Sequence, residues 1–398
     1  MDTSTQTPFE WETITKTSLP ALESPRFRES GLHKLPNAVS MYERILQGEA
    51  RAIQDEANEN IMLARVVGHL VLELYARRGI LGNRPCETII DEVMRSPTGY
   101  GDGDNVVFEV GRQYRDHLIR GFRTSTELYR YPSPSLHPSR PSYDKLEDMT
   151  RDLTKPSGKD YRTTRKKALA RDGFRCMITG YFDRRSLKYS AELQRMKETL
   201  NGISLNIETS HILNESTTQG VGTGEESSVV NKTHFAPGVM AILRQFGLEH
   251  LSLALEAVDG VHQIWNLLSL ELNLHSDLGR FNLWFESTGE PNCYKVCVSD
   301  MTIEQHIRRI STRPETSGSG APLAVEFRSD LQGAPPPDPQ LLALHATCAR
   351  VAHMSGATEF FDRLEWEAEE TNVLAPDGSS AHLLSSLMSP YAYIQEVT

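Results

Sequence analysis

Apolar residues recur with helical spacing through the first third of the chain. Over residues 41–79 they return every three or four positions, and Gly79 then ends the pattern. The positions that carry it are Ile45, Ile53, Ile61, Leu63, Val66, Val67, Leu70 and Leu74. Two shorter stretches, 86–94 and 106–122, show the same spacing. The pattern predicts a helical region over about residues 41–130, in which the first stretch forms one helix or two.

The middle of the chain mixes helical and strand periodicity. The stretch 190–200 is typical of a short helix, 205–213 alternates like a strand, and 236–257 is mostly helical. The run over 265–278 is apolar with polar interruptions. Beyond it, FNLWFES and CYKVCVS are separated by a turn near Gly289 and predict two paired strands. Helices and short strands in this order predict an α+β protein.

Segments rich in Pro, Gly and Ser separate these regions. Residues 1–40 are polar and carry no sustained period, so we expect an extended or disordered arm. A Pro-rich, basic linker is predicted over 131–160, and a Ser/Thr/Gly-rich loop over 214–233. After a further Pro/Gly/Ser stretch over 313–337, an Asp-Pro pair at the N-cap predicts a helix over about 338–354.

The composition is that of a soluble globular protein. The chain has 398 residues, 38% of them hydrophobic and 24% charged, which suits two or three domains. No stretch approaches the ~20 apolar residues of a membrane span, and the start lacks the pattern of a secretory signal. Five scattered cysteines are typical of a reducing compartment rather than a disulfide framework. We therefore expect an intracellular protein of the nucleus or cytoplasm, not secreted and without a membrane partner.

A basic segment interrupts an otherwise acidic chain. The formal net charge is −11, which argues against a basic coat over the whole protein. Residues 151–175 nevertheless hold nine basic side chains against three acidic ones. This segment is either a solvated loop and helix face or a patch that contacts phosphates. The candidate nucleic-acid contacts are Arg162, Arg165, Lys166, Lys167, Arg171 and Arg175.

The basic segment leads into RDGFRCMITG at residues 171–180, which contains a single cysteine. Because Thr179 stands where a second cysteine would complete a CxxC pair, Cys176 cannot form a tetrahedral zinc site locally. Cys293 and Cys297 lie four apart on a predicted strand and could join it, although cysteines so spaced usually just pack. We favour Cys176 as a small buried apolar residue.

Three polar residues lie in apolar surroundings and in a set order. His211 closes the strand pattern NIETSH, Asn266 opens NLLSLELNLH, and His275 closes that run nine positions later. With RDGFRCMITG before them, these motifs resemble the HNH endonuclease family, in the variant found in uncharacterised fungal proteins whose first hairpin starts with CxxTG. The likeness covers about residues 165–290. The chain contains no GxSxG or HExxH motif and no phosphate-binding loop.

The resemblance implies a ββα-metal fold and a metal-dependent phosphodiesterase that acts on DNA, with RNA as the alternative. It assigns His211 as the general base, whose neutral imidazole can deprotonate water. It assigns Asn266 to hold the loop and orient His211, and His275 to bind a divalent metal. Mg²⁺ is the first choice, because it keeps most of its waters and needs few protein ligands, with Mn²⁺ or Zn²⁺ as alternatives.

The chain departs from the family pattern at the expected metal ligands. Ser210 precedes the base histidine, where relatives often carry Asp, Glu or His as a second ligand. Leu278 and Gly279 replace an aromatic-Asp pair beyond the last histidine. Asp277 is a substitute candidate, but it lies only two residues from His275, and such positions do not share a helix face.

The gap of 54 residues between His211 and Asn266 also exceeds the family's usual length, and His262 within it is a reserve ligand. Two functions are therefore open: an active endonuclease, or a degenerate HNH-fold module that serves protein or nucleic-acid interaction. The expected divisions are an arm (1–40), a helical region (41–130), a linker (131–160), an HNH-like domain (161–300) and a C-terminal helical region (301–398).

Overall fold

The structure is a computed structural model. It describes residues 14–95, 103–124, 147, 150, 161–214, 235–257, 260–313, 323–331 and 333–370. Most of the linker predicted over 131–160 and of the loop predicted over 214–233 lies outside these ranges. Within the described ranges, no helix is long and apolar enough to cross a membrane.

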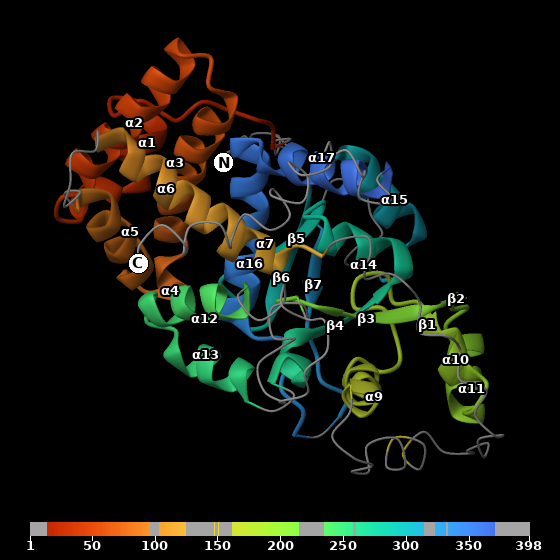
Figure 1. The fold of residues 1–398 in the computed structure, drawn as a ribbon. Coiled ribbons are helices and arrows are strands. Elements are labelled where there is room, and N and C mark those ends of the chain that lie inside the picture. The colour runs from red at the N-terminus through yellow and green to blue at the C-terminus, as the bar shows by residue number, and fades with distance from the viewer. Residues whose placement is uncertain are drawn as a thin grey trace, which may run out of the picture.

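Helices form the N-terminal part of the protein, as the apolar spacing predicts (Figure 1). They are α1 (Pro25–Ser30), η1 (Leu32–Lys34), α2 (Ala38–Gln54), α3 (Asn58–Ala76), α4 (Arg78–Leu81), α5 (Arg84–Met94), α6 (Gly103–Gln113), the π-helical turn η2 (Tyr114–Ile119) and α7 (Arg120–Phe122). The long pattern over 41–79 is two helices, because the backbone of Glu56 turns to a positive φ of 54° between them. α3 packs against both α2 and α6.

The extended or disordered arm expected over 1–40 is wrong for residues 25–40, which contain α1, η1 and the start of α2. Ser24 caps α1 by accepting a hydrogen bond from the Phe27 amide, Pro25 occupies the first helical turn, and Gly31 ends the helix. Phe27 is buried and its ring packs on Tyr42 of α2 at 4.6 Å. A helix of six residues has too few turns to show an apolar period, so only its caps mark it in the sequence.

The strands form three small sheets. Their bounds are β1 (Phe182–Asp183), β2 (Ser204–Leu205), β3 (Ile207–His211), β4 (Leu267–Glu271), β5 (Leu283–Ser287), β6 (Cys293–Val298) and β7 (Ala324–Glu326). β1 pairs with β2 in parallel, β3 pairs with β4 antiparallel, and β5, β6 and β7 form an antiparallel sheet in that order. Together with the helices, these sheets make the protein α+β, as predicted.

Helices surround and connect the three sheets. These are α9 (Tyr161–Arg171), α10 (Arg184–Leu187), α11 (Ala191–Thr199), α12 (Phe235–Gln245), α13 (Glu249–Glu256), η5 (Gly260–His262), η6 (Ile264–Asn266), α14 (Leu272–Gly279), α15 (Met301–Ile310), α16 (Pro339–Ser355) and α17 (Ala357–Glu370). α16 begins where the Asp-Pro pair predicts: the Asp338 carboxylate accepts hydrogen bonds from the amides of Gln340 and Leu341.

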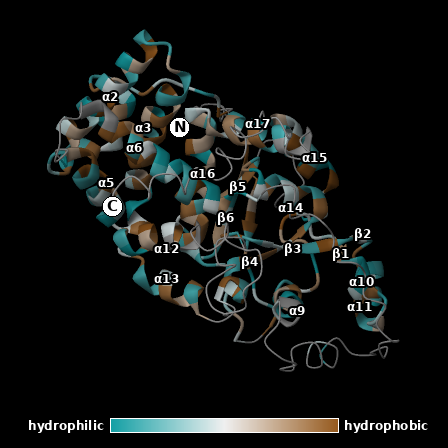
Figure 2. Ribbon diagram, in the orientation of Figure 1, coloured by the Kyte–Doolittle hydropathy of each residue, from teal (hydrophilic) through white to brown (hydrophobic). Residues whose placement is uncertain are grey.

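α16 lies at the centre of the molecule, between α3 and β5 (Figure 1). It is buried on nearly all sides, and Figure 2 shows apolar residues along its length and along the neighbouring strands. The buried apolar residues of the N-terminal helices, of β3 and β4, and of α16 form one continuous cluster. The helical regions at both ends of the chain and the β-containing part therefore share a core.

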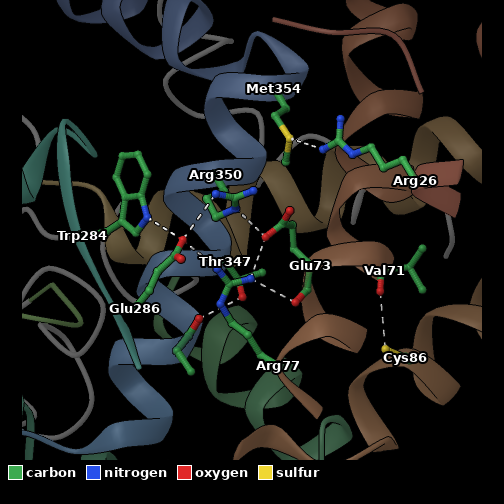
Figure 3. A network of polar contacts seen from close by, with 11 residues as sticks. Arg26, Val71, Glu73, Arg77, Cys86, Trp284, Glu286, Thr347, Arg350 and Met354 are labelled. Atoms are coloured by element: carbon green, nitrogen blue, oxygen red, sulfur yellow. Dashed lines mark hydrogen bonds and ion pairs between the residues drawn. The ribbon is translucent and has the colours of Figure 1, made fainter. Parts of the chain in front are cut away.

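An ion-pair network crosses this shared core (Figure 3). The Glu73 carboxylate on α3 binds Arg77 at 2.6 Å and Arg350 of α16 at 2.7 Å. Both arginines also lie 3.4 Å from Glu286 on β5, which accepts a hydrogen bond from Trp284. Burial alone would raise the pKa of Glu73, but the charges of Arg350 and Arg77 outweigh it and lower this pKa to about 2. The network fixes α3, α16 and β5 relative to one another.

Candidate functional site

Two paired strands, β3 and β4, and the helix α14 lie together around the histidines singled out in the sequence, although α12 and α13 separate β3 from β4 along the chain. His211 ends β3 and pairs with Leu267, the first residue of β4. α14 begins directly after β4 with no intervening loop, because Glu271 ends the strand and caps the helix. Its carboxylate accepts hydrogen bonds from the amides of Asn273 and Leu274 at 3.1 and 3.0 Å. His275 therefore lies one turn into the helix, close to the strand pair.

Asn266 is fully buried immediately before β4 and joins two loop segments. Its Oδ1 accepts a hydrogen bond from the Leu213 amide at 2.9 Å, and its Nδ2 donates to the Leu213 carbonyl at 3.0 Å and to the Val261 carbonyl at 2.8 Å. All three partners are backbone atoms. The Asn266 amide thus holds the backbone at Leu213, two residues beyond His211, and not the His211 ring itself. It also fixes the segment that leads into β4.

His211 is half-buried, and a second histidine faces it. The His211 Nε2 lies 3.1 Å from Nδ1 of His262, which ends η5. Burial, and then the nearby His262 and His275, lower the pKa of His211 to about 3. The imidazole is therefore neutral at pH 7, as a general base must be before it takes a proton.

His275 is half-buried on α14 and is also neutral at pH 7. Burial and the charge of Arg165 on α9 lower its pKa to about 4. The Arg165 guanidinium pairs with the Glu208 carboxylate at 2.6 Å and donates to the Ile207 carbonyl at 3.2 Å, which places it beside β3. Arg165 thus brings a positive charge to His275. Glu208, its partner, was not singled out in the sequence.

The other two candidate metal ligands lie away from these histidines. Ser210 is buried in the middle of the β3–β4 pair, and its side chain points to the opposite face of the strand from that of its neighbour His211. The Asp277 carboxylate accepts a hydrogen bond from Asn282 at 3.4 Å. Its pKa is raised by burial and by the charge of Glu271. Among the described residues, no three His, Cys, Asp or Glu side chains are arranged to hold a metal ion.

The basic residues expected to contact nucleic acid occupy different environments. Arg171 is fully buried, and this expectation is corrected. Its guanidinium pairs with Asp172 at 2.6 Å and donates to the carbonyls of Ile264 and Leu267 at 2.7 and 2.8 Å. A charge without access to solvent cannot meet a phosphate, so Arg171 instead ties α9 to the start of β4.

The remaining basic candidates lie nearer the surface. Arg165, Lys166 and Lys167 are half-buried on α9, and the side chain of Arg162 lies outside the described residues. The Arg175 guanidinium stacks on the Phe182 ring at 4.2 Å. It also lines a hollow of about 380 Å³.

RDGFRCMITG forms a tight turn after α9, and its cysteine packs inside that turn. The Cys176 amide donates to the Tyr181 carbonyl at 2.8 Å, and Arg175 bridges to Phe182 across the turn. Cys176 is fully buried, and its Sγ accepts a hydrogen bond from the Thr179 amide. Burial raises the pKa of the Cys176 thiol. Cys293 and Cys297 lie on β6 as free thiols.

Known proteins provide no further information on this site. No family model, no curated protein and no solved structure matches this chain.

Proposed function

We propose that this protein is an HNH-type endonuclease that hydrolyses phosphodiester bonds in DNA, with RNA as the alternative substrate. One observation carries the proposal. The β-β-α order of β3, β4 and α14 brings His211, at a strand end, near His275 on the helix, with Asn266 holding the loops between them. The motifs set this order in sequence, and the ladder between β3 and β4 supports it in space.

In this function the neutral His211 imidazole takes a proton from water. The water oxygen then forms a bond to phosphorus, and the bond from phosphorus to the leaving 3′ oxygen breaks. That oxygen takes up a proton from solvent, and His211 later returns its own proton to solvent. The low pKa of His211 makes it a weak base in the free protein. A phosphate bound nearby would raise this pKa, because an opposite charge within about 4–6 Å favours the imidazolium form. Arg165, whose charge acts on His275 and whose guanidinium pairs with Glu208, is an arginine that could attract such a phosphate.

The proposal includes a divalent cation at His275: Mg²⁺ first, with Mn²⁺ or Zn²⁺ as alternatives. A neutral imidazole is the form that coordinates metals, and His275 is neutral at pH 7. A single imidazole would leave the remaining positions of such a cation to water and to substrate oxygen atoms, which Mg²⁺ commonly accepts. When bound, such a cation would stabilise the negative charge that develops on the phosphate.

The surroundings of two expected metal ligands favour a second candidate function: Ser210 is buried on the face of β3 opposite to His211, and the Asp277 carboxylate accepts a hydrogen bond from Asn282. In this alternative, the protein is a degenerate HNH-fold module that binds nucleic acid or another protein without cleaving it. The helical regions at both ends of the chain, which share a core with the β3–β4 pair, would then carry the interaction.

Plasmid nicking tests the two candidates. Supercoiled DNA is incubated with the protein and Mg²⁺, Mn²⁺ or Zn²⁺, beside the variants His211→Ala and His250→Ala. His250 is an exposed histidine whose ring contacts Gln340, so its variant controls for loss of a histidine elsewhere. Cleavage by the parent and by His250→Ala, but not by His211→Ala, is the expected result. Absence of cleavage of this DNA, and of RNA in a parallel assay, with every metal by the folded parent would refute the nuclease and leave the binding module.

A further inference from the structure

The long connection between β3 and β4 returns to the candidate site at His262. After α12 and α13, the chain forms the short turn η5, and His262 ends that turn. Its Nδ1 lies 3.1 Å from Nε2 of His211, with the two rings inclined at 57°. Both side chains are half-buried. Two imidazole nitrogens at this distance form a hydrogen bond when one carries a proton and the other presents a lone pair.

The backbone on both sides of this pair is fixed by one side chain. Asn266 binds the Val261 carbonyl, directly before His262, and both backbone atoms of Leu213, two residues after His211. The Asn266 amide therefore fixes the backbone positions from which the His211 and His262 side chains project. The hydrogen bond between His211 and His262 therefore joins two side chains whose backbone is held in place.

Gly260 makes the turn before His262 tight. A Cβ at this position would lie 2.3 Å from the Ala254 carbonyl oxygen and 2.4 Å from that of Leu255, which is closer than real Cβ contacts. η5 therefore lies directly on the end of α13, with its backbone in contact with the carbonyls there. This close approach leaves the turn little room to shift His262 away from His211.

We propose that His262 is a positioning residue: its Nδ1 accepts a hydrogen bond from Nε2–H of His211 and so fixes the orientation and tautomer of that ring. In a neutral imidazole a proton on Nε2 places the basic lone pair on Nδ1. His211 thus presents one defined nitrogen as the base. This role for the lone pair rests on the proposed nuclease function, whereas the tautomer and ring orientation are properties of the folded protein alone.

Long-range ¹H–¹⁵N spectra of the histidine rings at pH 7.5 test the inference without any cleavage assay. The His211 signals are identified by their loss in His211→Ala. In the parent, His211 is expected to be in the Nε2–H form. His262→Phe keeps a ring but has no acceptor, so His211 should become a mixture of tautomers. His262→Asn places a carbonyl oxygen near the former Nδ1 and should restore the Nε2–H form.

Two results would overturn the inference: an Nδ1–H tautomer of His211 in the parent, or identical His211 signals in the parent and His262→Phe. If the parent cleaves DNA, His262→Phe should lower kcat by about tenfold to a hundredfold, the usual loss when a supporting hydrogen bond is removed, with KM unchanged. His262→Asn should recover most of that loss. If the spectra behave as expected but the parent does not cleave, the nuclease proposal fails and the positioning of His211 stands.

Discussion

Replacing Asn266 by alanine removes three buried hydrogen bonds at once. The lost bonds are those to the Leu213 amide, at 2.9 Å, and to the carbonyls of Leu213 and Val261, at 3.0 and 2.8 Å. Each buried partner then lacks a bond, and an unsatisfied buried polar group costs about 1–3 kcal/mol. Because water can reach some of these groups once the loop loosens, we expect a total loss of about 3–5 kcal/mol in the free energy of unfolding.

Two measurements check this expectation at different scales. Urea unfolding followed by tryptophan fluorescence gives the global loss of stability for Asn266→Ala. Amide hydrogen exchange gives the local effect: the Leu213 amide, now without its acceptor, should exchange about a hundredfold faster or more. Asn273→Ala is the matched control, because Asn273 is exposed on α14 and its replacement should change stability by less than about 0.5 kcal/mol.

Asn266→Asp separates the donor from the acceptor. It keeps an oxygen for the Leu213 amide but turns the donating Nδ2 into an acceptor that faces two carbonyls. We expect this variant to lose at least as much stability as Asn266→Ala at pH 7, because like partial charges then face one another. A loss below about 1 kcal/mol in Asn266→Ala, with unchanged exchange at Leu213, would refute the reasoning that this amide holds both loops.

Other parts of the fold give further expectations. Glu73→Gln leaves the half-buried Arg77 and Arg350 with Glu286 as their shared counter-charge and should cost about 1–3 kcal/mol in urea unfolding. An unchanged free energy of unfolding would contradict this. The pKa of Glu73, lowered to about 2, gives stability that is complete above pH 4.5 and lost as pH falls towards 2, so Glu73→Gln should flatten the urea-midpoint profile there. Burial lowers the pKa of His69 to about 4, so protonation of this ring favours the unfolded chain below pH 6.5. His69→Gln should therefore remove about 2 kcal/mol of the stability that the parent loses between pH 6.5 and 5. An unchanged profile of stability against pH would argue against a buried neutral ring. Gly111→Ala places a Cβ 2.4 Å from a carbonyl oxygen of α3 and should lower stability by about 1–3 kcal/mol by thermal or urea unfolding, unlike alanine at the open Gly79.

The sequence predicts the longer helices well, because their apolar faces repeat over several turns. The stretch with the Asp-Pro start becomes α16, and the strand expected over 205–213 contains β3. The short elements α1, α10 and β7 were not predicted, since a few residues carry no period and their conformation depends on caps and on contacts distant in sequence. The run over 265–278 is apolar with polar interruptions, a pattern that does not show where it divides into a buried strand and a helix at the capping Glu271.

Within the candidate site, the sequence shows the order of the residues along the chain but not which of them are in contact. The order of His211, Asn266 and His275 is visible as a motif. The burial of Arg171 is not visible in the sequence. Its partners are the adjacent Asp172 and two carbonyls about 90 residues away, which it reaches only when α9 packs against β4. A basic run on a helix shows no sign of which side chain turns inward.

The pairing of His211 with His262 depends in turn on how the connection between β3 and β4 folds. A connection of 54 residues looks too long for a compact ββα unit. Loop closure, however, costs only about 0.6 kcal/mol for each doubling of length. The connection also binds the N-terminal helices: Phe246 stacks on Tyr114 at 5.9 Å, and Thr88 donates to the Gln245 carbonyl. Once α12 is held there, α13 and η5 return to β4 along a fixed path, and the residue at the end of that path is His262. The length that departs from the HNH pattern is therefore what brings a second imidazole to the candidate base.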